Sequence, residues 1–201
     1  MKLEIRQIRP EDAQAYVEFF DTTPHDDHNP EHTCYCVNWC AVDHRGLEEP
    51  DRARRREMAL EYVKSGVLQG YLALDEGKII GWCNANTKED CRYCAGLLYA
   101  VPELQQAASS PEEKVKAVYC FMVAEEYHRQ GVARALLQAV CADAAAEGFD
   151  AVEAYPHKDA GDVTQQYAGP ERLFLSEGFH RVAELPTKHV YRKELKETDR
   201  S

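Results

Sequence analysis

Residues 115–147 read VKAVYCFMVAEEYHRQGVARALLQAVCADAAAE, and the rest of the chain can be interpreted around them. The part from Val115 to Ala124 is mostly apolar and β-prone, which predicts a buried strand that ends at the turn 125–127. From Gly131 onward, apolar residues recur every three or four positions, which predicts a helix of about four turns. The apolar positions of that helix are Val132, Ala135, Leu136, Ala139, Val140 and Ala144.

The junction between the strand and the helix, residues 128–133, has the features of an anion-binding site. The first amides of a helix have no partner within it, and with the helix dipole they favour a negative ligand. Small residues at Gly131 and Ala133 allow a phosphate to approach the backbone, and Arg129 and Arg134 supply charge. An ordinary strand-to-helix connection is the alternative interpretation.

This stretch resembles motif A of the GNAT acyltransferase superfamily, in which a loop of pattern Arg/Gln-x-x-Gly-x-Gly/Ala after the fourth strand binds the pyrophosphate of acetyl-coenzyme A. The six matching positions are His128, Arg129, Gln130, Gly131, Val132 and Ala133. The first position departs from the usual Arg or Gln, and Arg129 beside it offers the charge instead. The resemblance implies that these residues and Arg134 contact the coenzyme.

Two later stretches extend the resemblance over nearly the whole chain. Residues 169–179 look like the last helix of the superfamily, which ends in Gly-Phe, and Val190 to Leu195 looks like its closing strand. The implied fold is a single α/β domain over residues 1–195, with a mixed, mostly antiparallel sheet flanked by helices and with splayed fourth and fifth strands. The tail 196–201 is expected to be disordered.

Local patterns predict the remaining elements. An alternating strand covers 3–8, a helix opens at Arg9-Pro10-Glu11-Asp12, and another spans 51–65 before Gly66. Residues 69–74 and 78–84 form a hairpin around Asp75-Glu76-Gly77, and 149–155, 170–177, 181–184 and 189–193 supply a strand, a helix and a final hairpin. Residues 21–50 are irregular, and 88–114 is a long connection that suggests a lid or disorder.

Composition narrows the class of partner. The 201 residues suit one domain, and the net charge of −11, from 24 basic and 35 acidic side chains, argues against nucleic acid as a partner. It also fits, weakly, a cationic acceptor. No apolar run approaches the roughly 20 residues of a membrane helix, and eight cysteines without a secretion signal suggest reduced thiols, so a cytoplasmic location without a membrane partner is expected.

Transfer of an acyl group from a thioester to an amine has three requirements. The amine must be neutral, the tetrahedral oxyanion must be stabilised, and the thiolate must be protonated or be able to leave as an anion. The resemblance assigns stabilisation of the oxyanion to the backbone of Phe121, Met122 and Val123. Glu153 and Tyr155 would then face the splay, with Glu153 opposite its apolar neighbours, as a direct or water-relayed base. A solvated strand residue is the alternative for Glu153.

The general acid is less clear from the sequence. Many superfamily members have a tyrosine four residues before the glycine of Gly-Phe, but here that position is Phe174, which the resemblance places against the pantetheine arm. Either Tyr155 or Tyr167 then donates the proton, or the thiolate leaves without a protein donor, since a thiol has a pKa of about 8.5.

The segment 25–44 is rich in cysteine and histidine. With Cys91 and Cys94 it offers ligands for zinc, but its spacing matches no standard zinc motif, and no metal is expected. In GNAT folds this segment commonly lines the acceptor pocket, which favours Tyr35 and Trp39 as acceptor-binding residues. Core filling is the alternative.

The sequence thus predicts a GNAT N-acetyltransferase that moves an acetyl group from acetyl-coenzyme A to a primary amine of a small molecule or peptide by direct attack in a ternary complex. Two alternatives remain open at this stage: an acyl-coenzyme A sensor without turnover, and a zinc-stabilised interaction module built on 25–44. A homodimer is possible.

Overall fold

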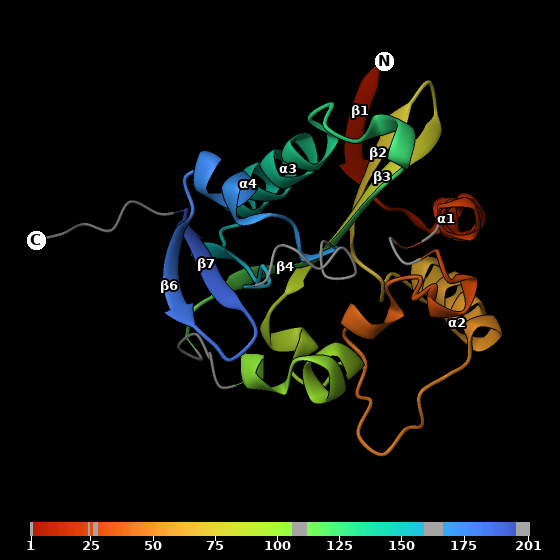
Figure 1. The fold of residues 1–201 in the computed structure, drawn as a ribbon, viewed down its shortest axis with the longest axis horizontal. Coiled ribbons are helices and arrows are strands. Elements are labelled where there is room, and N and C mark those ends of the chain that lie inside the picture. Colours follow the sequence, from red (N-terminus) through yellow and green to blue (C-terminus); the bar gives the residue numbers. More distant parts are fainter. Residues whose placement is uncertain (1, 24, 26–27, 106–111, 159–166, 196–201) are drawn as a thin grey trace, which may run out of the picture.

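The computed structural model describes residues 2–23, 25, 28–105, 112–158 and 167–195, which form a seven-stranded sheet with helices on both faces. The strand order is β1-β2-β3-β4-β5-β7-β6 (Figure 1). The strands are β1 (Leu3–Gln7), β2 (Gly70–Asp75), β3 (Lys78–Thr87), β4 (Val115–Val123), β5 (Ala151–Ala154), β6 (His180–Glu184) and β7 (His189–Glu194). All neighbours are antiparallel except β4 and β5, so the predicted mixed, mostly antiparallel sheet is confirmed.

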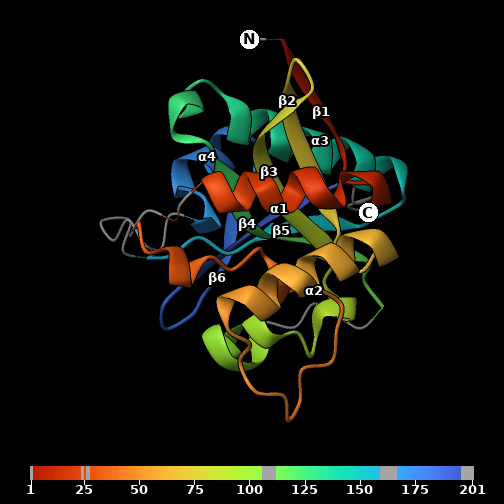
Figure 2. The ribbon, with the colours of Figure 1, turned by 90° about the vertical axis from the view of Figure 1, so that its right-hand side faces the viewer.

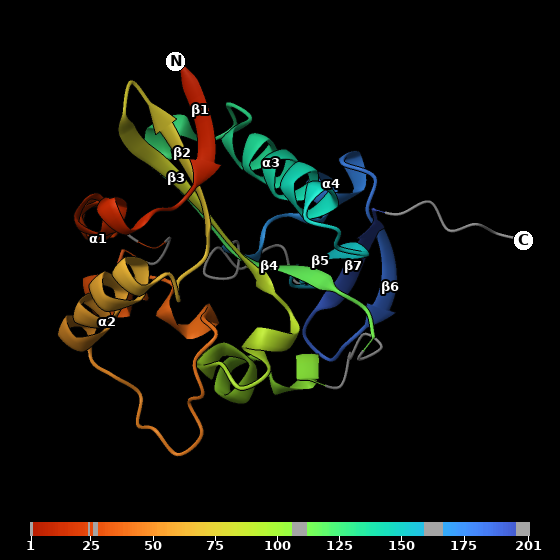
Figure 3. The ribbon, with the colours of Figure 1, turned by 180° about the vertical axis from the view of Figure 1, so that it is seen from behind.

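The helices divide between the two faces of the sheet. Helices α1 (Ala13–Thr22) and α2 (Arg52–Ser65) lie on one side, in front in Figure 2, and α3 (Val132–Ala146) and α4 (Glu171–Ser176) lie on the other (Figure 3). Each face has its own apolar core, one built on α1 and α2 and the other on α3 and α4. A strand covered on both faces is apolar throughout, which explains why β4 does not alternate.

Helix boundaries follow the signals in the sequence. The side chain of Asp51 accepts a hydrogen bond from the amide of Arg54 and caps the start of α2, and Gly66 ends the helix with φ +75°. Helix α3 starts after Gly131, as its apolar spacing predicts. No helix in the described part of the chain is long and apolar enough to cross a bilayer.

The connection between β3 and β4 is largely part of the core. Residues 88–105 contain three short helical segments, at Glu89–Cys91, Gly96–Ala100 and Pro102–Gln105. Buried apolar side chains hold them in place: Cys91, Cys94, Leu97, Val101 and Leu104. The expectation of a lid or disorder is therefore wrong for this part, while 106–111 and the tail 196–201 lie outside the described residues.

Strands β4 and β5 separate partway along β4. Their parallel pairing ends at Val118 and Ala154, while β4 continues beside β3 as far as the pair Gly81 and Val123. Within the described residues, the edge of β4 from Tyr119 to Val123 therefore pairs with no strand on its β5 side. This is the predicted splay, and it positions the site described next.

Candidate functional site

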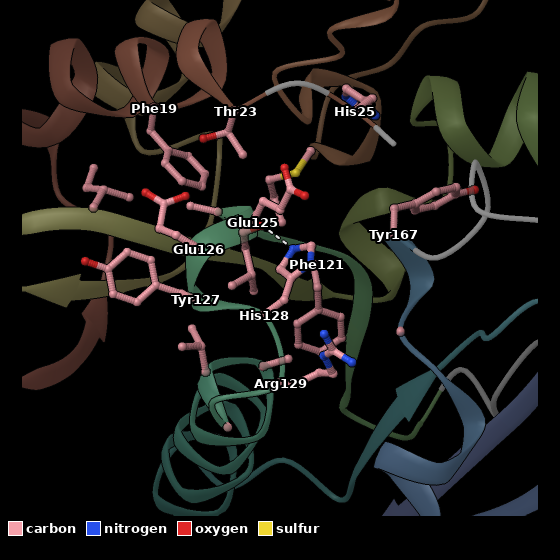
Figure 4. A pocket seen from close by; sticks show the side chains of 18 of the residues that line it. Phe19, Thr23, His25, Phe121, Glu125, Glu126, Tyr127, His128, Arg129 and Tyr167 are labelled. Carbon is pink, nitrogen blue, oxygen red and sulfur yellow. Dashed lines mark hydrogen bonds between the residues drawn. The ribbon is translucent and has the colours of Figure 1, made fainter. Parts of the chain in front are cut away.

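A large pocket, of about 1340 Å³, opens at the splay. Its wall comes from α1 and the segment after it, the β2–β3 turn, the end of β4 with the loop into α3, and the segment leading into α4 (Figure 4). Of the predicted coenzyme-binding residues, those that line the pocket are Phe121, Met122, Val123, His128, Arg129, Gly131, Val132, Ala133 and Arg134. Segments far apart in the sequence thus converge on one cavity.

The open edge of β4 offers backbone hydrogen-bonding groups to this pocket. The amide of Ala124 donates to the carbonyl of Ile80 on β3, so alternation turns the amides and carbonyls of Phe121 and Val123 away from β3. These groups lie where an extended ligand can pair with the strand as a further strand would. The prediction for 121–123 concerned the backbone, and the structure places that backbone at the pocket.

The loop before α3 forms an anion seat of backbone amides. Gly131 has φ +85°, a left-handed conformation that favours glycine, and a Cβ there would meet nothing within 4 Å. The amide of Ala135 donates to the carbonyl of Gly131, so the amides of Val132, Ala133 and Arg134 precede the first hydrogen bond of the helix. They can serve an anionic ligand.

Three arginines line the same pocket as this seat. Arg129 and Arg134, both predicted, line the pocket together with Arg172 of α4, which the sequence did not single out. Arg134 is tied to α4 by an ion pair of 3.0 Å with Glu177. The pocket wall therefore carries cations from the loop, from α3 and from α4.

His128 and Gln130 support the loop. The imidazole Nε2–H of His128 donates to the carbonyl of Val123 at 2.8 Å, which closes the turn after β4 (Figure 4). Gln130 is absent from the pocket wall, and its side-chain amide donates to the carbonyl of Glu126 at 2.6 Å. Histidine at position 128, in place of the usual Arg or Gln, thus stabilises the loop through a hydrogen bond within it.

Glu153 and Tyr155 lie on the face predicted by alternation but outside the pocket wall. The side chain of Glu153, 4% exposed, forms ion pairs with Lys88 at 2.6 Å and with Arg192 at 3.0 Å, and it accepts a hydrogen bond from Tyr155. Burial and the negative charge of Glu153 raise the pKa of Tyr155 well above its ordinary value. Glu153 already has Lys88, Arg192 and Tyr155 as partners, and neither Glu153 nor Tyr155 lines the pocket.

Tyr167 is the one predicted acid–base residue that lines the pocket. Its hydroxyl lies 3.2 Å from Nε2 of His157, and burial raises its pKa. The predicted catalytic set is therefore not brought together: Tyr167 reaches the pocket, and the Glu153–Tyr155 pair stands behind the β5 side of the splay.

Three predicted binding residues are core residues in the structure. Phe174 is fully buried against Phe121, Phe179 and Tyr191, so it supports the wall from behind. Tyr35 is also fully buried and donates to Asp21 at 2.6 Å. Trp39 stacks on Tyr119 with ring centroids 4.8 Å apart. None of the three lines the pocket.

The cysteine and histidine residues give no sign of a metal centre. Among the residues that the structure describes, no three histidine, cysteine or acidic side chains are grouped to hold a metal ion. Cys36, Cys40, Cys91 and Cys94 are free thiols in the core beneath α1 and α2. The zinc-stabilised module therefore gains no support.

The pocket wall opposite the anion seat carries polar and acidic residues that the sequence did not single out. Glu18, Phe19 and Thr22 come from the last turns of α1, and Thr23 and His25 follow them. Figure 4 shows Phe19, Thr23 and His25 at the top of the pocket and His128 and Arg129 lower, with Glu125 and Glu126 between them. Acidic side chains therefore line the pocket from two segments, Glu18 from α1 and Glu125 and Glu126 from the turn after β4.

Comparison with known proteins agrees with this geometry. The family model described as "Acetyltransferase (GNAT) family" matches residues 7–168. None of the curated proteins matches the chain in sequence.

Similar solved structures include the polyamine N-acetyltransferase of Drosophila melanogaster, with 15% identity, coverage of 96% of this chain and 100% of that one, and a TM-score of 0.60. The PaiA N-acetyltransferase of Thermoplasma acidophilum, in complex with coenzyme A, has 14% identity, coverage of 96% and 99%, and a TM-score of 0.55. YncA of Salmonella typhimurium, with acetyl-CoA, has 16% identity, coverage of 98% and 96%, and a TM-score of 0.54. At these identities the likeness shows the fold, and the family model, which spans most of the chain, shows the membership: the chain belongs to the GNAT acetyltransferase family.

Proposed function

We propose that this protein transfers an acetyl group from acetyl-coenzyme A to a primary amine. The observation that carries the proposal is the continuity of one pocket with two features, the unpaired edge of β4 and the amides at the start of α3. These features fit the two ends of one ligand: the β4 edge suits an extended amide-bearing arm, and the amides with Arg129 and Arg134 suit a pyrophosphate. Acetyl-coenzyme A, bound in YncA, has both parts and supplies the activated acetyl group.

The acceptor side of the proposal rests on charge. Glu18 of α1 and Glu125 and Glu126 of the turn after β4 line the pocket, and the whole chain carries a net charge of −11. Such a field attracts a cationic amine, and it sets the acceptor apart from the anionic coenzyme. The similar Drosophila enzyme is a polyamine acetyltransferase, which is consistent with this class of acceptor.

The transfer is proposed to be direct, without an acyl-enzyme. Cys120 is the cysteine of β4, next to the open edge. Its hydrogen bond with Cys36 and its burial raise the pKa of the thiol well above the ordinary value. Because the thiolate is the nucleophilic form, a thiol held protonated and 2% exposed is a poor nucleophile.

Replacing Cys120 with Ser tests direct transfer. We expect Cys120→Ser to keep kcat within about threefold of the wild type, because serine retains the shape and loses only the thiol chemistry. Single-turnover acetyl transfer and mass spectrometry of the protein after exposure to acetyl-coenzyme A alone would measure this. A stable acetyl adduct on Cys120, or loss of activity in a folded variant, would contradict direct attack.

Thiol release tests the function as a whole. Purified protein with acetyl-coenzyme A would be assayed against spermidine, agmatine, free lysine and a dipeptide with a free amino terminus. We expect release of coenzyme A that depends on at least one amine. Saturable binding of acetyl-coenzyme A with no amine-dependent release would instead indicate a sensor.

A further inference from the structure

A buried lysine lies directly behind the pocket wall, next to Tyr167. Lys188 precedes β7 and is 1% exposed. Its ammonium nitrogen Nζ lies 3.1 Å from the carbonyl oxygen of Tyr155 and 2.6 Å from Nε2 of His157. The backbones of His157 and Lys188 form an antiparallel bridge, so the main chain fixes the two side chains beside each other.

The same histidine nitrogen connects this lysine to the pocket. Nε2 of His157 lies 3.2 Å from the hydroxyl of Tyr167, and the two rings are edge-on, with centroids 5.5 Å apart. Nζ of Lys188 also lies 5.2 Å from the centre of the Tyr167 ring. A continuous line of polar atoms therefore runs from the hydroxyl of Tyr167, a residue of the pocket wall, through His157 to Lys188.

The surroundings of Lys188 disfavour its charged form. The titratable groups that face it are Glu103 from the short helix 102–105, Cys120 from β4, Tyr155, His157 and Tyr167. Among the residues that the structure describes, no carboxylate pairs with Nζ, and Glu103 instead accepts a hydrogen bond from Thr187. Burial lowers the pKa of Lys188 to about 7, although Glu103 and Cys120 oppose the shift. At neutral pH this amine can take up a proton.

We propose that Tyr167, His157 and Lys188 form a relay that removes the proton of the acceptor's ammonium group. This inference rests on the proposed amine acetylation. Tyr167 is the member in the pocket, and His157 and Lys188 act through it. The proton of the acceptor passes to the Tyr167 oxygen as the Tyr167 proton passes to His157 Nε2 and on to Lys188 Nζ. One N–H bond breaks on the acceptor and one forms on Lys188, and the acceptor nitrogen gains its lone pair.

The geometry at His157 makes the relay depend on the state of Lys188. In the tautomer that carries its hydrogen on Nδ1, Nε2 has a single lone pair, so it can accept from only one donor at a time. Charged Lys188 donates to it, whereas neutral Lys188 leaves it to accept from Tyr167. The relay is therefore ready only when Lys188 is neutral, and wild-type kcat should rise through a pH near 7 and then level off.

The pH profile of kcat tests the relay with the fastest amine of the thiol-release panel. In Lys188→Met, which keeps the volume of the side chain, we expect kcat at pH 7.5 to fall about 100-fold, in the range of general-base effects. The plateau of kcat above about pH 7 should also disappear. Without the relay, the rate depends on the fraction of the acceptor amine that is already neutral, so kcat should rise about tenfold per pH unit up to the pKa of the acceptor, about 10. Tyr167→Phe should give the same profile without removing a buried amine.

Lys193→Met is the matched control, since Lys193 lies on β7, which begins just after Lys188, and its Nζ lies 6.0 Å from the centre of the Phe179 ring. Its profile should match the wild type. Binding of acetyl-coenzyme A should be unchanged in all three variants, and the urea midpoint of Lys188→Met should not fall, because a desolvated amine is removed. A Lys188→Met or Tyr167→Phe enzyme that keeps the plateau would overturn the relay while leaving the acetyltransferase function intact. Absence of amine-dependent release in the wild type would instead refute the function.

Discussion

Replacing Gly131 with Val should weaken binding of acetyl-coenzyme A at least tenfold, or by about 1.4 kcal/mol or more. Gly131 has φ +85° at the start of α3, where a β-branched residue is strained by roughly 1–2 kcal/mol. Open space surrounds the position of a Cβ, so the effect does not come from a clash within the protein. The loop must either keep its strain or turn its amides away from the ligand, and a Cβ would also project where the phosphate approaches.

Gly148 provides the control for this prediction. It follows the other end of α3, has φ +76°, and likewise has no atom within 4 Å of an added Cβ. Gly148→Val should therefore cost similar stability in urea unfolding while leaving the coenzyme dissociation constant unchanged. Equal affinities in the two variants, measured by calorimetry, would show that the anion seat lies elsewhere.

Replacing Glu153 with Ala should lower the free energy of unfolding by about 2–4 kcal/mol. The carboxylate is the shared partner of Lys88 and Arg192, and its removal leaves two poorly solvated cations less well compensated. The loss is limited because Arg192 keeps Glu113 and Glu194 as partners. Urea unfolding measures the effect.

The control is Glu57→Ala, which breaks an ion pair of 3.1 Å with Arg54 in which the two side chains are 65% and 52% exposed. An exposed partner should cost less than about 1 kcal/mol. The isosteric Glu153→Gln separates the two roles of Glu153. If the role of Glu153 is structural, kcat of Glu153→Gln should stay within about tenfold of the wild type. If Glu153 is the general base, the same variant should lower kcat by about 10² to 10⁴.

Much of the fold follows from patterns of neighbouring residues. The apolar run 115–123 and the three-and-four spacing after Gly131 give β4 and α3, and the glycine itself marks a left-handed turn that the structure confirms. Alternation also places Glu153 correctly, since Val152 and Ala154 pack with α3 and α4. These signals are local, so one sequence is enough to read them.

The parts that were missed depend on contacts between distant segments. Nothing near Lys188 in the sequence indicates burial, and its partners His157 and Tyr167 belong to other segments. Tyr35 and Trp39 were expected to bind an acceptor because aromatic residues in that segment suit an amine, but packing against Asp21 and Tyr119 buries them. The charge partners of Glu153 likewise come from β7 and from the end of β3. Pairing at this range depends on the completed sheet.

The most direct test of the account is calorimetric titration of acetyl-coenzyme A into the protein, beside the same titration of Gly131→Val. We expect saturable binding at one site per chain in the wild type and clearly weaker binding in the variant, because the ligand pairs with the β4 edge and seats its pyrophosphate at α3. No binding to the wild type at millimolar coenzyme, or equal binding to both proteins, would contradict the assignment of this pocket.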